Sequence, residues 1–142
     1  MTMDEGNSRG HRDVRYFRGD EQLVTRLDWE CLPDHSYRIT TQSPDGEKVL
    51  VGRDLFDAVQ RLRLELEPSG WRLAVQAALR GAYASGMLRD MYGGRKMYFC
   101  RMGRQVVRAE MIDILEPAQL DDVVTVEEQL EFLDRWRDSI RK

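Results

Sequence analysis

Cations and glycines concentrate in one short stretch of this chain, residues 80–96. Its charged residues are the cations Arg80, Arg89, Arg95 and Lys96 and one acid, Asp90, and its glycines are Gly81, Gly86, Gly93 and Gly94. Glycine permits positive φ and lets a ligand or another chain approach the backbone closely. Loops that connect strands carry binding residues more often than the strands themselves do. We therefore predict that this stretch, called the 80–96 segment below, is a recognition loop between two strands.

Anion binding is one function that these residue types allow. The backbone amides of Gly93 and Gly94 could form a nest for an anion, with Arg89 and Arg95 beside it. The segment nevertheless matches neither of two common phosphate-binding patterns, GxxxxGK[ST] and GxGxxG. Three tyrosines in or after the segment could stack on nucleic-acid bases: Tyr83, Tyr92 and Tyr98. The net charge of −3 argues against nucleic acid, because nucleic-acid-binding domains usually carry a basic surplus.

A purely structural role for the 80–96 segment is the alternative. Arg89 and Asp90 could pair with each other or bond to buried backbone, while Met87, Leu88 and Met91 pack into the core. A long connection stabilised in this way needs no partner. Long connections in compact domains are nevertheless functional more often than short ones.

The other residues with catalytic or metal-binding potential are spread singly along the chain. A nucleophile needs a base within hydrogen-bonding reach, yet no spacing connects His11 or His35 with Cys100. The chain has no HExxH, paired CxxC or DxDxDG sequence that would bind a metal. We predict a protein without catalytic residues, metal or cofactor. Cys31 and Cys100 are then reduced structural thiols, as expected in the cytoplasm.

The charges of the C-terminal half are divided by sign. The acids begin after the basic stretch, and residues 110–134 contain no Lys or Arg. Complementary fields speed the encounter of two proteins and disfavour wrong partners, so the acidic stretch is predicted to be a docking surface for a basic partner. Two solvated faces of opposite sign are the simpler alternative.

Length and composition indicate one globular domain. The chain has 142 residues, of which 42% are hydrophobic and 33% charged, which is enough for one core. Residues 1–20 are polar and lack the apolar run of a signal peptide, so we predict a flexible charged lead-in followed by a single domain over 21–142. The apolar runs are too short for a bilayer span, so no membrane partner is expected.

Periodicity and turn signals give the order β-β-α-β-loop-β-β-α. The predicted strands are 36–42, 47–52, 71–79, 96–101 and 105–115, the first pair joined by the turn at 43–46. One helix follows the N-cap Asp54 and ends before Pro68. The last helix follows a capping box of Thr125 and Glu128 and has an apolar stripe that includes Leu130 and Trp136. This order predicts an α+β fold in which two main helices pack on an antiparallel or mixed sheet of about five strands.

Parts of the C-terminal half resemble a loose group of known proteins. The resembling elements are SGMLRDM at 85–91, Gly93 and Gly94, the strand through Tyr98, and the EEQ run at 127–129 ahead of Trp136. With these elements, residues 71–140 are similar to small acidic α+β proteins that are encoded beside polymorphic or contact-dependent bacterial toxins. The resemblance implies a cytoplasmic immunity protein, a non-enzymatic inhibitor that binds one toxin domain. Such toxins are often basic nucleases.

The sequence therefore predicts a protein-binding module that inhibits a toxin by steric and electrostatic occlusion. The 80–96 segment and the strand after it supply the predicted contacts Arg89, Asp90, Tyr92, Arg95 and Tyr98, because interfaces favour Tyr and Arg anchors. The predicted acidic face comprises Asp121, Asp122, Glu127, Glu128 and Glu131. The alternative function is a small anion- or nucleotide-binding domain, or an enzyme, that uses the basic glycine-rich segment.

Overall fold

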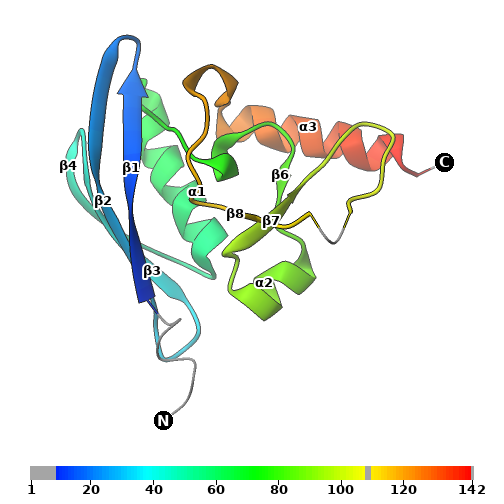
Figure 1. The fold of residues 1–142 in the computed structure, drawn as a ribbon, viewed down its shortest axis with the longest axis horizontal. Helices are drawn as coiled ribbons and strands as arrows, with labels where there is room; N and C mark the ends of the chain where they lie inside the picture. Colours follow the sequence, from blue (N-terminus) through cyan, green and yellow to red (C-terminus); the bar gives the residue numbers. More distant parts are fainter. Residues whose placement is uncertain (1–8, 108–109, 142) are drawn as a thin grey trace.

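A five-stranded antiparallel sheet forms one side of the molecule (Figure 1). The computed structural model describes residues 9–107 and 110–141. The strand order is β4-β3-β2-β1-β5. The strands are β1 (Arg9–Arg18), β2 (Glu21–Cys31), β3 (Tyr37–Ser43), β4 (Gly46–Gly52) and β5 (Arg72–Leu73). The hairpin of β3 and β4 was predicted from its turn, and the α+β class of the chain is confirmed.

Strand β1 lies where the sequence predicted a flexible lead-in. Its residues alternate in exposure, with Val14 and Tyr16 buried and charged residues such as Asp13 and Arg15 exposed. Ten residue pairs join it to β2, from Arg9 opposite Glu30 to Arg18 opposite Glu21. The lead-in prediction is therefore wrong for residues 9–20, which form this strand and its turn into β2. Residues 1–8 lie outside the described part of the chain.

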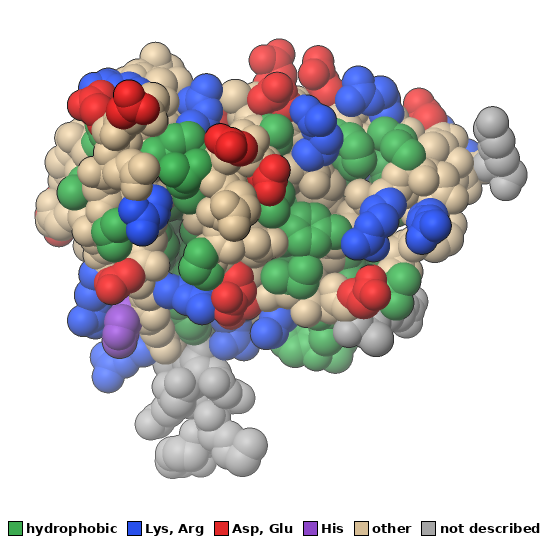
Figure 2. Space-filling model, turned by 45° about the horizontal axis from the view of Figure 1, so that its top comes forward, with side chains coloured by type: hydrophobic (Ala, Val, Ile, Leu, Met, Phe, Trp, Pro, Cys, Tyr) green, Lys and Arg blue, Asp and Glu red, His purple; other side chains and the backbone are tan. Residues whose placement is uncertain are grey.

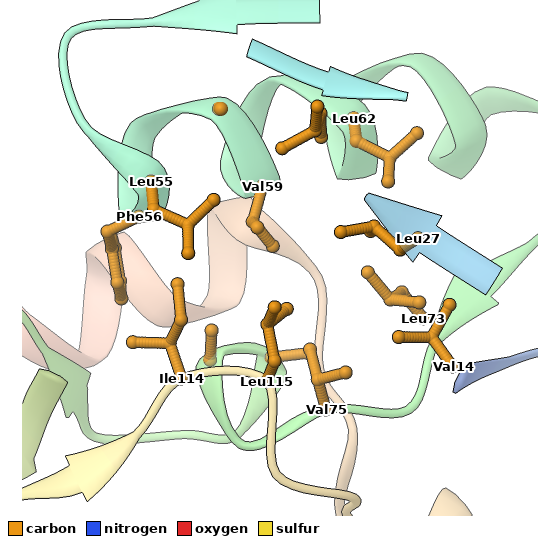
Figure 3. Close-up of a cluster of buried hydrophobic side chains, with 14 of the residues drawn as sticks. Val14, Leu27, Leu55, Phe56, Val59, Leu62, Leu73, Val75, Ile114 and Leu115 are labelled. Carbon is orange, nitrogen blue, oxygen red and sulfur yellow. The ribbon is translucent and has the colours of Figure 1, made fainter. Parts of the chain in front are cut away.

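Helix α1 (Leu55–Leu66) packs on the inner face of this sheet, against β3 and β4. Asp54 caps it as predicted, because its carboxylate accepts a hydrogen bond from the Asp57 amide at 2.8 Å. Figure 3 shows Leu55, Val59 and Leu62 of α1 directed into a cluster with side chains of the sheet and of the later chain. The cluster includes Val14, Leu27, Leu73, Val75, Ile114 and Leu115. The core thus lies between the sheet, α1 and the later segments that contain Val75, Ile114 and Leu115.

A second, smaller sheet includes the strand predicted over 96–101, which spans Lys96–Phe99 in the structure. It has the order β6-β7-β8, with β6 (Ala82–Tyr83), β7 (Lys96–Phe99) and β8 (Ile112–Asp113). The strand predicted over 71–79 is wrong beyond β5, because residues 76–78 form a 3-10 turn, η3 (Gln76–Ala78). The strand predicted over 105–115 is likewise reduced to β8, and residues 108–109 within it lie outside the described residues. The short helix α2 (Gly86–Tyr92) lies between β6 and β7.

Helix α3 (Val126–Ser139) closes the other side of the molecule and begins at the predicted capping box. Its buried face consists of Val126, Gln129, Leu133 and Trp136. Leu130, which the predicted apolar stripe included, is instead 51% exposed. The short helices η2 (Glu67–Ser69) and η4 (Leu120–Asp122) complete the described elements. With 14 residues α3 is the longest described helix, and none of the described helices has the length and apolar content of a transmembrane span.

A buried polar cluster joins α1, η3 and α3. Arg63 and Gln129 are each 3% exposed, and the Arg63 guanidinium donates to Gln129 Oε1 at 2.5 Å and to the Val124 carbonyl at 2.7 Å. Gln129 Nε2 donates to the carbonyls of Ala77 and Leu79, both at 2.7 Å. Burial lowers the pKa of Arg63 to about 10, and the carboxylate of Glu67 at 3.7 Å opposes that shift. Side chains thus satisfy carbonyls that would otherwise need a neighbouring strand.

Candidate functional site

The 80–96 segment contains the helix α2 and is not the irregular loop that the sequence predicted. The hydroxyl of Ser85 caps α2 by accepting a hydrogen bond from the Leu88 amide at 3.2 Å, and Gly93 ends it in the left-handed conformation at φ 61°. Leu88 is fully buried and fixes the helix to the core. Both end signals, a serine N-cap and a glycine after the last turn, were present in the sequence. The helix is only seven residues long, so its periodicity was too short to reveal it.

A cavity of about 890 Å³ opens between α2, the β2–β3 turn and the start of α1. We call it the α2 cavity. Its walls come from residues 31–33 and His35 at the end of β2 and in the turn, Tyr37 of β3, Arg53 and Asp54 before α1, and residues 89–93 with Arg95. These distant segments meet because the β2–β3 turn and the last residue of β4 lie at the same end of an antiparallel sheet, where α1 also begins.

Arg89 and Asp54 form an ion pair in the wall of the α2 cavity. The Arg89 guanidinium lies 2.9 Å from Oδ2 and 3.2 Å from Oδ1 of Asp54, whose side chain is 8% exposed. Arg89 Nε also donates to the Ala84 carbonyl at 3.0 Å, and the guanidinium lies over the Phe56 ring. Arg89 was predicted as a partner contact. The ion pair also gives it the structural role that the sequence left open, with Asp54 and not Asp90 as its partner, and its contact with a partner stays a prediction.

The two glycines after α2 allow close packing against the cavity wall. A Cβ atom on Gly93 would lie 2.2 Å from the hydroxyl oxygen of Tyr37, and one on Gly94 would lie 2.8 Å from Asp54 Cγ. Both residues have positive φ, 61° and 73°. Their amides donate to the Leu88 carbonyl, at 3.5 Å for Gly94. The nest that the anion-binding alternative requires is therefore already occupied by the end of α2 itself.

Arg95 lines the cavity and lies over the ring of Trp29. Its guanidinium carbon is 5.6 Å from the centre of the Trp29 ring, and its Nε donates to the Tyr92 carbonyl at 2.8 Å. Burial raises the pKa of Tyr37, the positive charge of Arg95 opposes that rise, and Cys31 and Asp54 add to it. Arg95 and Tyr37 of the cavity wall thus both contact Trp29, which lies behind them.

The rim of the α2 cavity is exposed and chemically mixed. Asp90 is exposed, Met91 is 63% exposed and Tyr92 is half-buried. His35 faces them from the β2–β3 turn with a φ of 71°, a conformation that non-glycine residues adopt rarely. Arg53 has 74% of its side chain exposed and lies 3.9 Å from Asp57. The rim therefore offers a flexible apolar side chain, a tyrosine and charges of both signs.

Tyr98 does not belong to this surface. It is 2% exposed, and its hydroxyl has no hydrogen-bond partner among the described residues. Its neighbour Met97 is fully buried as well. Both faces of β7 are covered, so alternation along the strand could not tell which side chain faces solvent. The prediction of Tyr98 as a partner contact is contradicted by its burial.

The residues of the predicted acidic face lie on η4 and α3 and do not line the α2 cavity. Figure 1 places η4, the orange-brown turn at the top, and α2, at the bottom, at opposite ends of the molecule. Asp121 and Asp122 are exposed in η4, and Glu127 and Glu131 are exposed on α3. Glu128 is also exposed but bonds the Thr125 amide at 2.8 Å in the capping box. The structure does not bring the two predicted sets of contact residues together.

Several other acids of the 110–134 stretch are neutralised by arginines. Arg12 lies 2.8 Å from Glu116 and 3.6 Å from Asp113, and Arg101 lies 3.8 Å from Glu110. Figure 2 shows acidic and basic side chains interspersed over the visible face and not separated into patches of one sign. The division by sign in the sequence is thus largely cancelled in space, and the acidic set that remains is the one on η4 and α3.

Half of the α2 cavity was missed by sequence reasoning. Cys31 was predicted to be a structural thiol, and His35, Tyr37 and Arg53 were not predicted as contacts. The signal that could have found them is the order of the strands. Three consecutive antiparallel strands place the β2–β3 turn at the same end of the sheet as the start of the helix that follows β4. The first predicted strand began at residue 36, so β2 and its turn into β3 were not part of the predicted arrangement.

No protein-family model matches the chain, and a search of curated proteins finds no match. Within residues 9–107 and 110–141, no group of three or more His, Cys, Asp or Glu side chains is placed to hold a metal ion.

Proposed function

We propose that this protein is a non-enzymatic protein-binding module whose main contact surface is the α2 cavity and its rim. The observation that carries the proposal is the rim itself, where Met91, Tyr92 and Asp90 lie exposed or half-exposed beside a cavity of about 890 Å³. Tyrosine and methionine are enriched at protein interfaces, and methionine adapts its shape to a partner. Arg89 and the two glycines hold this rim in place from behind.

The finer proposal is an immunity-type inhibitor that neutralises a cognate bacterial toxin in the cytoplasm. The resembling run at 85–91 forms α2, so the resemblance falls on the proposed contact surface. A segment of the toxin that entered the cavity would be bound by the rim. The rest of the domain would then block access to the toxin's surface around that segment.

The exposed acids are proposed to act at a distance. Asp121, Asp122, Glu127 and Glu131 are exposed on η4 and α3, which do not line the α2 cavity. Their field would attract a basic toxin, such as a nuclease, and raise its association rate. In this proposal the cavity rim determines how long the complex lasts, and the acids determine how fast it forms.

A capture experiment with matched variants tests the proposal. The tagged protein is expressed in its native host, and the co-purifying protein is identified by mass spectrometry, produced pure and bound in vitro. Replacing the anchor Tyr92 by Ala together with Met91→Asp is expected to weaken binding by about 30-fold or more, since losing a central anchor costs about 2 kcal/mol. The control is Met102→Asp, at a methionine that is 44% exposed and outside the cavity.

Two results would overturn the proposal. Equal binding by the cavity variant and the wild type would exclude the rim as the contact surface. A purified protein that is stabilised in proportion to added phosphate or nucleotide, with no protein partner captured, would favour the anion-binding alternative. For the immunity proposal, the captured protein must also lose its toxic activity when the wild-type chain is added.

A further inference from the structure

Strand β4 forms an open edge of the large sheet. It is the terminal strand in the order β4-β3-β2-β1-β5, and Figure 1 shows it at the margin of the molecule. In an antiparallel pair, alternate residues direct their N–H and C=O groups toward the partner strand, and the remaining ones direct them away. On its outer side β4 therefore offers a row of backbone donors and acceptors that no described strand bonds.

This edge lacks most of the features that protect exposed strands. Proteins usually blunt an edge with proline, a bulge, a short strand or outward charges. The seven residues of β4 pair with β3 in continuous register, from Gly46 opposite Ser43 to Gly52 opposite Tyr37, and contain no proline. Val49 and Val51 are 55% and 47% exposed on its outer face. The one lysine, Lys48, instead bonds Glu65 of α1 at 3.1 Å.

We propose that β4 pairs antiparallel with β4 of a second copy of this chain. A twofold axis through Leu50 places Val49 opposite the second copy's Val51, and this contact occurs twice. The same axis places Glu47 opposite the second copy's Arg53, which follows β4 directly and has 74% of its side chain exposed. Apolar residues thus meet apolar ones and acids meet bases, as a symmetric interface requires.

The two neighbouring registers, with the axis through Lys48 or Val49, pair these side chains less favourably. We therefore expect the two copies to pair with the axis through Leu50. An axis through Lys48 would place the two Lys48 side chains directly opposite each other. An axis through Val49 would place Glu47 opposite the second copy's Val51, so the acid would lose its basic neighbour. A single pair of strands buries a small area, so we expect a dimer that dissociates on dilution and not a permanent one.

The oligomeric state in solution tests this pairing and does not depend on the proposed toxin partner. Sedimentation velocity of the full chain from low micromolar to near-millimolar concentration is expected to show a monomer–dimer equilibrium. Val51→Lys should weaken the dimer about tenfold, because it sets a charge against the second copy's Val49 in two places. Val24→Lys is the matched control, since Val24 is also half-exposed and also faces an arginine across the strand pair, but lies on β2 inside the sheet.

A charge exchange tests the register. Glu47→Arg and Arg53→Glu should each weaken the dimer several-fold, because each puts like charges opposite one another, and the double variant should restore it. Circular dichroism spectra and melting temperatures of all variants show whether they remain folded. A monomer at every concentration, or a dimer that Val51→Lys leaves intact, would overturn the proposal. Protection of β4 amides from hydrogen exchange only when a different protein binds would assign the edge to that protein's strand instead.

Discussion

At the residue scale, the carboxylate of Asp54 serves two structures at once. It accepts the Asp57 amide as the cap of α1, and it pairs with Arg89 of α2. Replacing Arg89 by Met keeps most of the side-chain volume and leaves this buried carboxylate without its cation. The free energy of unfolding is expected to fall by about 2 kcal/mol, the cost of an unpaired, mostly buried charge that is partly relieved by solvent. Urea denaturation of the purified variant measures it.

Arg53→Met is the control for that comparison. Arg53 lies next to Asp54 in sequence, but its side chain is 74% exposed and 3.9 Å from its carboxylate partner. Surface ion pairs of this kind contribute little, so a change within about 0.5 kcal/mol is expected. If the Arg89 variant lost no more stability than the Arg53 variant, Arg89 would be free to act as a partner contact after all.

A second prediction at the residue scale concerns Tyr16 of β1, which is fully buried. Burial raises the pKa of Tyr16 from 10 to about 12, and the hydrogen bond with Thr41 Oγ1 at 2.5 Å opposes that rise. A raised pKa favours the protonated hydroxyl in the folded state. Its contribution to stability is therefore complete below about pH 10 and is lost as the pH rises to about 12. Over that range the wild type should lose roughly 3 kcal/mol more than Tyr16→Phe, from a shift of about two pKa units.

Denaturation curves at a series of alkaline pH values measure the difference in slope. Tyr37 and Cys100, whose pKa values are also raised, are present in both proteins and cancel in the comparison. Parallel curves for the two proteins would show that Tyr16 ionises with similar ease in the folded and unfolded chains.

These residues show what a sequence can predict at this scale. The caps Asp54 and Thr125 were predictable, because a cap bonds an amide three residues away. The pairing of Asp54 with Arg89, 35 positions apart, was not, because nothing local records which carboxylate the folded chain brings to the arginine. The same limit applies to Tyr98, whose burial depends on the elements packed over both faces of a short strand.

At the scale of elements, the capping box of α3 offers a direct comparison within one helical turn. Glu128 bonds the Thr125 amide at 2.8 Å, whereas Glu127 is exposed in the same turn. Glu127→Ala and Glu128→Ala each remove one negative charge near the positive end of the helix, but only the second removes the carboxylate that accepts from the Thr125 amide. Glu128→Ala should therefore cost about 0.5–1 kcal/mol more stability than Glu127→Ala.

The stability difference between these two variants should depend on pH, because it comes from the ionised carboxylate of Glu128. Hydrogen bonds from the Thr125 amide and hydroxyl lower the pKa of Glu128. A lowered pKa means that the stabilisation is present above the ordinary glutamate range and is lost as the pH falls through the folded value. Thermal unfolding of both variants should show the gap at neutral pH and its disappearance in acid. A gap that persisted in acid would point to packing of the Glu128 side chain.

The elements that were predicted wrongly had competing signals. Alternation was present in β1, yet its exposed face is almost entirely charged, so the stretch resembled a solvated tail. Residues 71–79 also alternate, but the strand ends at Leu73 because Gln76, Ala77 and Ala78 turn in η3. There the side chains of Arg63 and Gln129 bond the carbonyl of Ala77 and replace a neighbouring strand. No local sequence pattern predicts that a side chain from a distant helix will donate a hydrogen bond to a given backbone carbonyl.

At the scale of the whole molecule, two halves meet at this cluster. The large sheet and α1 form one half, and the small sheet with α2 and α3 forms the other (Figure 1). The α2 cavity lies where the halves meet at one end, and the Arg63–Gln129 cluster lies where α1 faces α3. The fold class could be predicted from the order of elements. The cavity could not, because it exists only through the way the halves are joined.

Substitutions of Arg63 and Gln129 should therefore have non-additive effects on the free energy of unfolding. Arg63→Met leaves Gln129 Oε1 and the Val124 carbonyl without their donor and is expected to cost about 3 kcal/mol or more. Gln129→Leu should cost about 2 kcal/mol through the carbonyls of Ala77 and Leu79. The double variant should cost less than the sum, because the two side chains that require each other are removed together. Urea denaturation of the four proteins measures the coupling, with the exposed Arg61→Met as control. Strictly additive losses would mean that α1 and α3 are held independently of each other.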